Sequence, residues 1–198
     1  MSTEKFQNKY RIKSARATWY DYGGGAYFIT VRTKNGEHYF GETENNVMQL
    51  SEIGKNATKN LQNINNHYPY AEIPLFVVMP NHIHTIVFID GNVAHCRDVA
   101  RNVSTEMKTK PNENKNEKMV EIAKHQSLLC VVMRGLKSAV TKFANENGID
   151  FAWQTRFFDR IIRDQEEMNR IGVYIEDNIA AWANDCYNKK NNKNDDKM

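Results

Sequence analysis

The sequence predicts an α+β sandwich, in which a small and mainly antiparallel sheet has helices packed on one face. Short runs of β-branched and aromatic residues are bounded by glycine, proline and asparagine, which is typical of strands. Other segments repeat apolar residues at intervals of three and four, which is typical of amphipathic helices. The two kinds of segment are interspersed along 198 residues, a length that suits one domain.

The chain is expected to begin its sheet with a hairpin. Residues 23–25 are three consecutive glycines, and they break the chain before the predicted strand AYFITVRT at 26–33. The Asn-Gly pair at 35–36 is a strong hairpin signal. We therefore expect EHYFGE at 37–42 to turn back and pair with that strand.

A helix and two further strands follow. From residue 48 to about residue 66, apolar side chains recur at helical spacing. AEIPLFVVM at 71–79 and HIHTIVFID at 82–90 are predicted strands, because they are rich in β-branched and aromatic residues. Only the Pro-Asn break at 80–81 separates them, so they are expected to be antiparallel neighbours.

Two segments differ from the rest in composition. Residues from about 91 to 125 include KTKPNENKNEK, a highly charged and asparagine-rich stretch, so we expect an exposed insertion there. Residues 188–198 form a low-complexity polar sequence and are predicted to be a disordered tail. Residues 1–187 are thus predicted to form a single domain that carries the insertion.

The last part of the chain is expected to form a helix, a strand and a helix. SLLCVVMRGLKSAVTKFANENG at 127–148 has an apolar stripe at helical spacing and ends near a glycine. A strand is predicted around 156–162. The last helix is predicted to begin at Asp164, since Glu167 gives the spacing of a capping box, and to run to about residue 185. The complete order, β-β-α-β-β, insertion, α-β-α, fits a ferredoxin-like sandwich.

Composition excludes several classes of protein. The three cysteines, Cys96, Cys130 and Cys186, lie far apart and form no CxxC pair, which excludes a disulfide scaffold and a cysteine-rich zinc site. The polar N-terminus has no signal-peptide core, and no apolar run approaches the ~20 residues of a membrane span. We therefore expect a cytoplasmic protein with no membrane partner.

Two histidines, His82 and His84, lie inside the apolar strand VVMPNHIHTIVFID. Side chains alternate along a strand, so the two imidazoles share one face while Ile83 points to the other. Neutral imidazoles about 7 Å apart along a strand can converge on one divalent ion. Two protein ligands leave coordination positions open, as a catalytic metal site requires. A pair of surface histidines on a half-exposed strand is the alternative.

The last helix carries side chains that can complete such a site. Tyr174 and Asn178 are four residues apart, so they stack on one line of the helix surface. They fall at the edge of the apolar stripe, which consists of Met168, Ile171, Ile175, Ile179 and Trp182. The tyrosine can reach out of the helix–sheet seam, and the asparagine can offer its carbonyl oxygen to a metal. The alternative is that both are ordinary edge residues of an amphipathic helix.

Several blocks of the sequence resemble a known family. MPNHIH resembles the histidine–hydrophobic–histidine motif of single-tyrosine HUH transposases, and the chain resembles the REP-associated tyrosine transposases more closely still. The blocks that carry the resemblance are DYGGGAYFITVRTKN, HYFGE, LSEIGK, VVMPNHIH, RGLKSAVTKF and WQTRFFDRIIRDQEEMNRIGVYIEDN, in that order. The family fold is a ferredoxin-like sheet with helices on one side, which agrees with the elements predicted above.

The resemblance implies a role for each candidate residue. His82 and His84 would be metal ligands, Asn178 would complete the metal site, and Tyr174 would be the nucleophile. The implied reaction is a transesterification on single-stranded DNA that leaves a 5′-phosphotyrosine and a free 3′-OH. Imidazoles with amide and phosphate oxygens suit Mn²⁺, and abundance favours Mg²⁺, so we expect one of these ions and no organic cofactor. The family commonly has a proline after that asparagine, whereas this chain has Ile179, so the helix can continue.

The expected partner is single-stranded or hairpin DNA, and binding it would make the protein nucleoid-associated. A net charge of +3 is too small to establish this partner, but basic residues gather in three places. The candidate DNA contacts are Arg11, Lys13 and Arg16 near the N-terminus, Arg134 and Lys137 on the second helix, and Arg156, Arg160 and Arg163 before the last helix. Acidic residues are mixed with them, so a solvated surface is the alternative.

Other functions fit part of the sequence. A domesticated protein could bind DNA hairpins without cutting them, and a metal-dependent phosphoesterase could use water in place of the tyrosine. A relaxase or replication initiator shares the chemistry but usually has further domains. A histidine-triad nucleotide hydrolase would need a histidine where this chain has Ile86. A homodimer in which each tyrosine serves the partner's histidines and a monomer with the whole site in one chain both fit.

Overall fold

The computed structural model describes residues 24–91 and 128–188. Most of the predicted insertion and of the predicted tail lies outside these residues. The candidate DNA contacts Arg11, Lys13 and Arg16 lie outside them as well. None of the described helices combines the length and the apolar composition that a membrane span requires.

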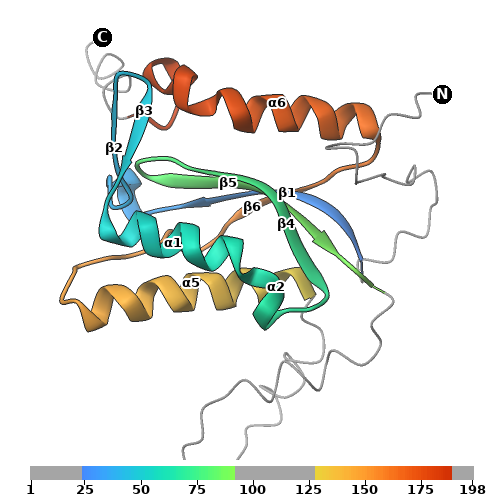
Figure 1. The fold of residues 1–198 in the computed structure, drawn as a ribbon, viewed down its shortest axis with the longest axis horizontal. Helices are drawn as coiled ribbons and strands as arrows, with labels where there is room; N and C mark the ends of the chain where they lie inside the picture. The colour runs from blue at the N-terminus through green and yellow to red at the C-terminus, as the bar shows by residue number, and fades with distance from the viewer. Residues whose placement is uncertain (1–23, 92–127, 189–198) are drawn as a thin grey trace, which may run out of the picture.

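A four-stranded antiparallel sheet forms the centre of the fold (Figure 1). Its strands are β1 (Gly25–Arg32), β4 (Ala71–Val78), β5 (His82–Ile89) and β6 (Phe158–Ile161), in the spatial order β4-β5-β1-β6. β1 therefore pairs with β5 on one edge and with β6 on the other. With a helix after β1 and another before β6, this is the β-α-β-β-α-β order of a ferredoxin-like fold. The predicted α+β class and mainly antiparallel sheet are confirmed.

Two long helices cover one face of the sheet. They are α1 (Glu52–Gln62) and α5 (Leu128–Glu146), and the short α2 (Ile64–His67) follows α1 (Figure 1). Their apolar stripes pack against alternate residues of the central strands. The core on this side includes Tyr27, Ile29 and Val31 of β1, Ile83, Val87 and Ile89 of β5, Leu61 of α1, and Val132, Leu136 and Val140 of α5. β1 and β5 thus bury odd-numbered residues under α1 and α5.

The last helix, α6 (Gln165–Ala181), packs on the opposite face, which corrects the prediction that all helices share one face (Figure 1). A second core lies beneath it and contains Ala26, Val77, Met79, Ile86, Ile162, Met168, Ile175 and Trp182. The reason is that β5 is buried on both faces along nearly its whole length. Such a strand needs a covering layer on each side, and α6 supplies the second one.

The predicted pairing of EHYFGE with the first strand is wrong. β2 (Gly41–Glu44) pairs instead with β3 (Val47–Leu50) in a separate two-stranded sheet. Both edges of β1 are already occupied, and the Asn45-Asn46 turn has φ of 51° and 59°, the left-handed values that a tight hairpin requires. The predicted first helix correspondingly starts later, at its N-cap Ser51, whose hydroxyl accepts from the Gly54 amide at 3.1 Å.

The remaining predicted elements are present in the structure. α5 and β6 lie within the predicted ranges, and β4 and β5 are antiparallel neighbours. At the start of α6, Asp164 Oδ1 accepts a hydrogen bond from the Glu167 amide at 2.7 Å, as the capping box requires. α6 ends at Ala181, and a 3-10 turn, η2 (Trp182–Asn184), follows it before the described chain ends at Asn188.

Candidate metal and nucleophile site

His82 and His84 lie side by side on the face of β5 that α6 covers. Both are buried, with 0% and 2% of their surface exposed, and their ring centroids are 4.5 Å apart. The alternative of two surface histidines is therefore wrong. Burying two imidazoles under a helix requires hydrogen-bond partners or a ligand for their ring nitrogens.

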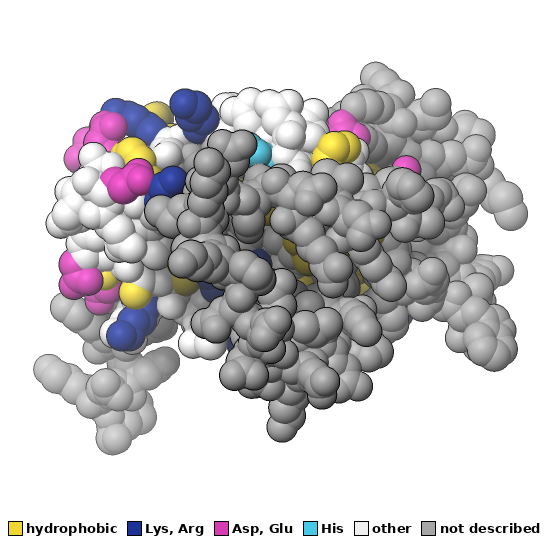
Figure 2. Space-filling view, turned by 90° about the horizontal axis from the view of Figure 1, so that it is seen from below, with side chains coloured by type: hydrophobic (Ala, Val, Ile, Leu, Met, Phe, Trp, Pro, Cys, Tyr) yellow, Lys and Arg dark blue, Asp and Glu magenta, His cyan; other side chains and the backbone are white. Residues whose placement is uncertain are grey.

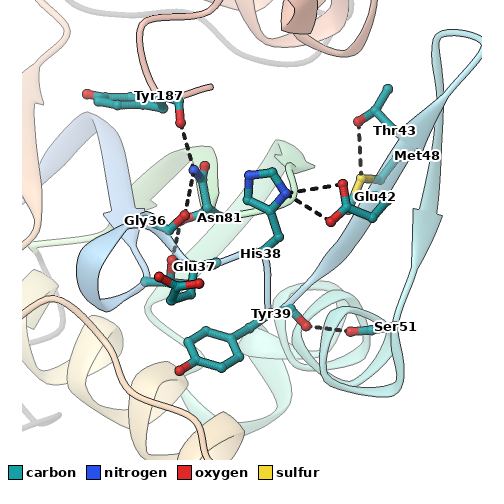
Figure 3. Close-up of polar contacts among 11 residues, drawn as sticks. Gly36, Glu37, His38, Tyr39, Glu42, Thr43, Met48, Ser51, Asn81 and Tyr187 are labelled. Atoms are coloured by element: carbon teal, nitrogen blue, oxygen red, sulfur yellow. Dashed lines mark hydrogen bonds and ion pairs between the residues drawn. The ribbon is translucent and has the colours of Figure 1, made fainter. Parts of the chain in front are cut away.

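Asn81 determines which nitrogen of His82 carries the proton. Its side-chain amide donates to the backbone carbonyls of Gly36 at 3.2 Å and Tyr187 at 2.7 Å (Figure 3). The remaining oxygen, Oδ1, lies 2.8 Å from His82 Nδ1. Because that oxygen can only accept, Nδ1 must be the protonated nitrogen. His82 Nε2 consequently carries a free lone pair, which is the state a metal ligand needs.

His84 is held from three sides. Its Nδ1 lies 2.8 Å from the Thr30 hydroxyl, and Phe28 stacks on its ring with centroids 5.3 Å apart. Its Nε2 lies 3.2 Å from the hydroxyl of Tyr174. A phenol donates readily to an imidazole nitrogen, so the consistent assignment has the His84 proton on Nδ1, donated to Thr30. Both histidines thereby keep Nε2 unprotonated, and their ring centroids lie 4.5 Å apart on one face of β5.

α6 brings Tyr174 and Asn178 to the histidines. Tyr174 is half-exposed, with its ring edge-to-face on Phe28 and 5.2 Å from the His84 ring. Asn178, one turn later, is buried, although a solvated edge residue was the alternative. The structure therefore gathers His82, His84, Tyr174 and Asn178, which the sequence had suggested as one set.

Burial dominates the electrostatics of the site. It lowers the pKa of His84 to about 4 and holds the pKa of His82 well below its usual value, where the charges of His84 and Arg32 add to the effect. Burial also raises the pKa of Tyr174, and the Asp185 carboxylate raises it further. Asn178 opposes both shifts, because its amide favours a protonated His82 and a deprotonated Tyr174. The amide thus lies between those two side chains.

The donor atoms fit a divalent cation. His82 Nε2 and Asn178 Oδ1 are buried and have no hydrogen-bond partner among the described residues. Buried polar atoms are nearly always paired, so two unpaired acceptors beside each other favour a bound cation there. In residues 24–91 and 128–188, no three His, Cys, Asp or Glu side chains form a metal-binding group, so the amide of Asn178 is the third candidate ligand. Two imidazoles and an amide oxygen suit Mn²⁺ or Mg²⁺.

Sequence reasoning missed the residues that surround this set. Phe28 and Thr30 support His84, Asn81 orients His82, and the Tyr187 ring lies 4.8 Å from the His82 ring. Alternation along AYFITVR does place Phe28, Thr30 and Arg32 on one face. The sequence contains no signal for the register that sets this face against the histidines, because strand pairing is a long-range contact.

No family model matches the chain. A protein of Haemophilus influenzae, described only as uncharacterized, is 31% identical over 188 residues, which cover 93% of this chain and 97% of that protein. The chain belongs to the same family as that protein. A solved structure of a REP-associated tyrosine transposase bound to a REP hairpin is similar, with a TM-score of 0.47 and 18% identity over 85% of this chain and 73% of the other. A proposed transposase of Deinococcus radiodurans R1 has a TM-score of 0.35 and 15% identity, over 84% and 97%.

Two of the candidate DNA contacts, Arg134 and Lys137, lie on the face of the sheet opposite to the histidines. Arg134 and Lys137 of α5 line an open cavity of about 590 Å³ together with Lys142 and Glu146. Lys137 Nζ donates to the backbone carbonyl of Gln154 at 2.7 Å, and burial lowers its pKa. Figure 2, a view of the molecule from below, shows Lys and Arg side chains interspersed with Asp and Glu on the described part of the surface.

The other three precede α6 in the sequence, and two of them contact its first turn. Arg156, Arg160 and Arg163 are all exposed. Arg160 forms an ion pair of 2.6 Å with the buried carboxylate of Glu167, which also accepts a hydrogen bond from the Arg163 amide. The structure therefore does not bring the five described cations together into one patch.

Proposed function

We propose that the protein is a metal-dependent tyrosine transposase, which cleaves and rejoins single-stranded or hairpin DNA through a covalent 5′-phosphotyrosine. The observation that carries this proposal is the position of Tyr174. Its hydroxyl lies 3.2 Å from His84 Nε2, beside the unpaired acceptors of His82 and Asn178. A nucleophile adjacent to open metal ligands, half-exposed so that a strand can reach it, is what phosphoryl transfer to tyrosine requires.

In this proposal His82, His84 and Asn178 hold the metal. Bound Mg²⁺ or Mn²⁺ would offset the charge of the scissile phosphate and align it for attack. The chain's own contribution is orientation, because Asn81 and Thr30 hold the protons on Nδ1 and leave both Nε2 lone pairs free for a ligand. Low histidine pKa values keep these ligands neutral at physiological pH, so no proton has to be displaced for binding.

Tyr174 then acts as the nucleophile. Its phenolic oxygen loses its proton to solvent and attacks phosphorus in line. The bond from phosphorus to the 3′-oxygen breaks, and that oxygen takes up a proton from solvent to leave as a 3′-OH. Asn178 assists by favouring the phenolate, against the burial that raises the pKa of the hydroxyl. The lone pair of His84 Nε2 can accept the phenol proton or hold a metal, but not both, so the Tyr174 hydroxyl would give up this hydrogen bond in the metal-bound protein. The new phosphotyrosine is a diester like the one broken, so a second 3′-OH can reverse the step without ATP.

The DNA is proposed to contact basic residues on both faces of the sheet. Arg156 and Arg163 are exposed, whereas the charge of Arg160 is offset by its ion pair with Glu167. Arg134 and Lys137 would bind phosphates on the far side of the sheet, at the cavity lined by α5. Arg11, Lys13 and Arg16 remain candidates from the sequence alone.

The test is a covalent adduct assay. Single-stranded oligonucleotides from palindromic repeats that flank the gene are incubated with protein and Mn²⁺, and adducts are separated on a denaturing gel. Wild type is expected to form an adduct and Tyr174→Phe to form none. Tyr39→Phe is the matched control, because Tyr39 packs on Phe151 in the core under α1 and α5.

Other outcomes would overturn the proposal. Cleavage by both wild type and Tyr174→Phe without an adduct would identify a phosphoesterase that uses water. Tight binding of every repeat strand, with neither cleavage nor adduct in Mg²⁺ or Mn²⁺, would identify a DNA hairpin-binding protein that has lost the chemistry.

A further inference from the structure

Arg32 lies directly beside the histidine pair, at the end of β1. In the register of β1 and β5, Arg32 is opposite His82, as Thr30 is opposite His84. Residues opposite each other in antiparallel strands project to the same face, with Cβ atoms roughly 4.5–5.5 Å apart. Arg32 therefore extends over the surface that holds His82, and its positive charge contributes to the low pKa of that histidine.

Tyr187 holds the guanidinium in this position. The Arg32 Cζ atom lies 4.0 Å from the centroid of the Tyr187 ring, a cation–π contact. The same ring lies 4.8 Å from His82 and 6.4 Å from His84, so the cation and the two imidazoles share one aromatic wall. The Tyr187 backbone is itself fixed, because its carbonyl accepts from Asn81 at 2.7 Å (Figure 3).

One donor of Arg32 is not used within the described structure. Its Nε atom is buried and has no hydrogen-bond partner among the described residues. Leaving a buried donor of a charged group unpaired is costly, so its presence next to two unpaired metal-ligand atoms favours an anionic acceptor at this place. The guanidinium is permanently charged, and its planar array of donors matches phosphate oxygens.

We propose that Arg32 binds the non-bridging oxygens of the phosphodiester that Tyr174 attacks, and that Tyr187 positions its guanidinium for this contact. The inference rests on the proposed function, since it assigns a further residue to the same site. Arg32 would offset part of the negative charge on those oxygens, and a metal held by the histidines would offset the rest. Charge held in place in this way stabilises in-line transfer without reorganisation during the reaction.

The first test removes the charge from the phosphate. Oligonucleotides carry either a phosphate or an uncharged methylphosphonate at the cleavage site, and their affinity is measured with Mn²⁺ in a Tyr174→Phe background. Arg32→Gln is expected to weaken binding of the phosphate strand by about tenfold or more, as the loss of a hydrogen bond to a charged group predicts. It should leave binding of the methylphosphonate strand unchanged. A merely structural role for Arg32 would weaken both strands equally, and that result would overturn the proposal.

Three further variants separate position from charge. Arg170→Gln is the matched control, since Arg170 pairs only with the exposed Glu166 on α6 among the interactions of the described residues. Tyr187→Phe keeps the ring under the guanidinium and should retain the affinity of the parent protein. Tyr187→Ala removes the ring and should weaken the phosphate strand selectively, by less than Arg32→Gln does. Thermal unfolding of each variant identifies any loss of binding that is due to a loss of folding.

The second test does not depend on cleavage. The Arg32 Nε–H resonance, assigned by its disappearance in Arg32→Lys, is followed by ¹H–¹⁵N NMR while a thymidine dinucleotide is added with Mg²⁺. The phosphate dinucleotide should shift this resonance, and its methylphosphonate analogue should not. If this shift occurs but no adduct ever forms, the proposed function fails and the Arg32 contact stands. If adducts form, but neither the Arg32 Nε–H shift nor the oligonucleotide affinities depend on the phosphate charge, only the Arg32 proposal fails.

Discussion

The hydroxyl of Tyr174 lies 3.2 Å from Nε2 of His84, although 90 residues separate them in sequence. The contact forms because α6 crosses the face of β5 that carries the histidines, and Phe28 packs against both rings. The whole candidate set lies within one chain. No exchange of helices between copies is needed to assemble it.

The first prediction concerns this assembly within one chain. A mixture of His84→Ala and Tyr174→Phe proteins should form no more adduct than either variant alone, because each chain lacks one half of its own site. The gel assay on mixed and separate proteins measures this. Recovery of a quarter or more of the wild-type adduct would instead mean that the tyrosine of one copy serves the histidines of another.

The second prediction concerns Asn81. Its replacement by alanine removes the acceptor that holds the His82 proton on Nδ1 and the donor that holds the Tyr187 carbonyl. We expect Mn²⁺ affinity to fall by about ten- to a hundredfold, the usual effect of losing a residue that orients a metal ligand. Titration calorimetry checks this, with Asn60→Ala on α1 as a control, since the Asn60 amide donates to Asn56 in the same helix. An unchanged affinity for the Asn81 variant would show that His82 is not a ligand.

The third prediction is a loss of stability in acid for the metal-free protein. The pKa of His84 is about 4 in the folded state against an ordinary 6.5, so only the unfolded chain takes up this proton between those values. Stability should be full above pH 6.5 and should fall as the pH drops toward 4, by about 3 kcal/mol from His84 alone. His82 shifts in the same direction and adds to the loss. Denaturant unfolding across this range should give a shallower slope for His84→Gln, and an equal slope would contradict the assignment.

The fourth prediction concerns the start of α6. Asp164→Ala removes the side chain that caps the helix through the Glu167 amide, and this should lower the free energy of unfolding by about 1 kcal/mol. Since α6 carries both Tyr174 and Asn178, metal affinity and adduct formation should also fall modestly in Asp164→Ala. Asp164→Asn, which can still accept the hydrogen bond, should retain most of the stability. Equal destabilisation by both replacements would mean that charge, and not capping, is the contribution of Asp164.

The local pattern of residues was sufficient to predict most of the elements. Alternation in HIHTIVFID placed His82 and His84 on one face of a strand, and helical spacing placed Tyr174 and Asn178 on one line of a helix. The Asp164 cap also followed from a spacing of three residues. These features depend on neighbours within a few positions, so the sequence alone determines them.

Only the tertiary structure decided how those elements meet. Which face of the sheet α6 covers depends on β5 being buried on both sides, and neither strand alternation nor helix periodicity distinguishes the two faces. The same holds for the separate β2–β3 hairpin, which forms because β5 and β6 already occupy both edges of β1. Arg32, Asn81 and Tyr187 come from three distant segments and meet at the histidines only through strand register and the path of the chain after α6. Long-range packing selects one arrangement among those that local preferences allow, and it is this packing that places the candidate site.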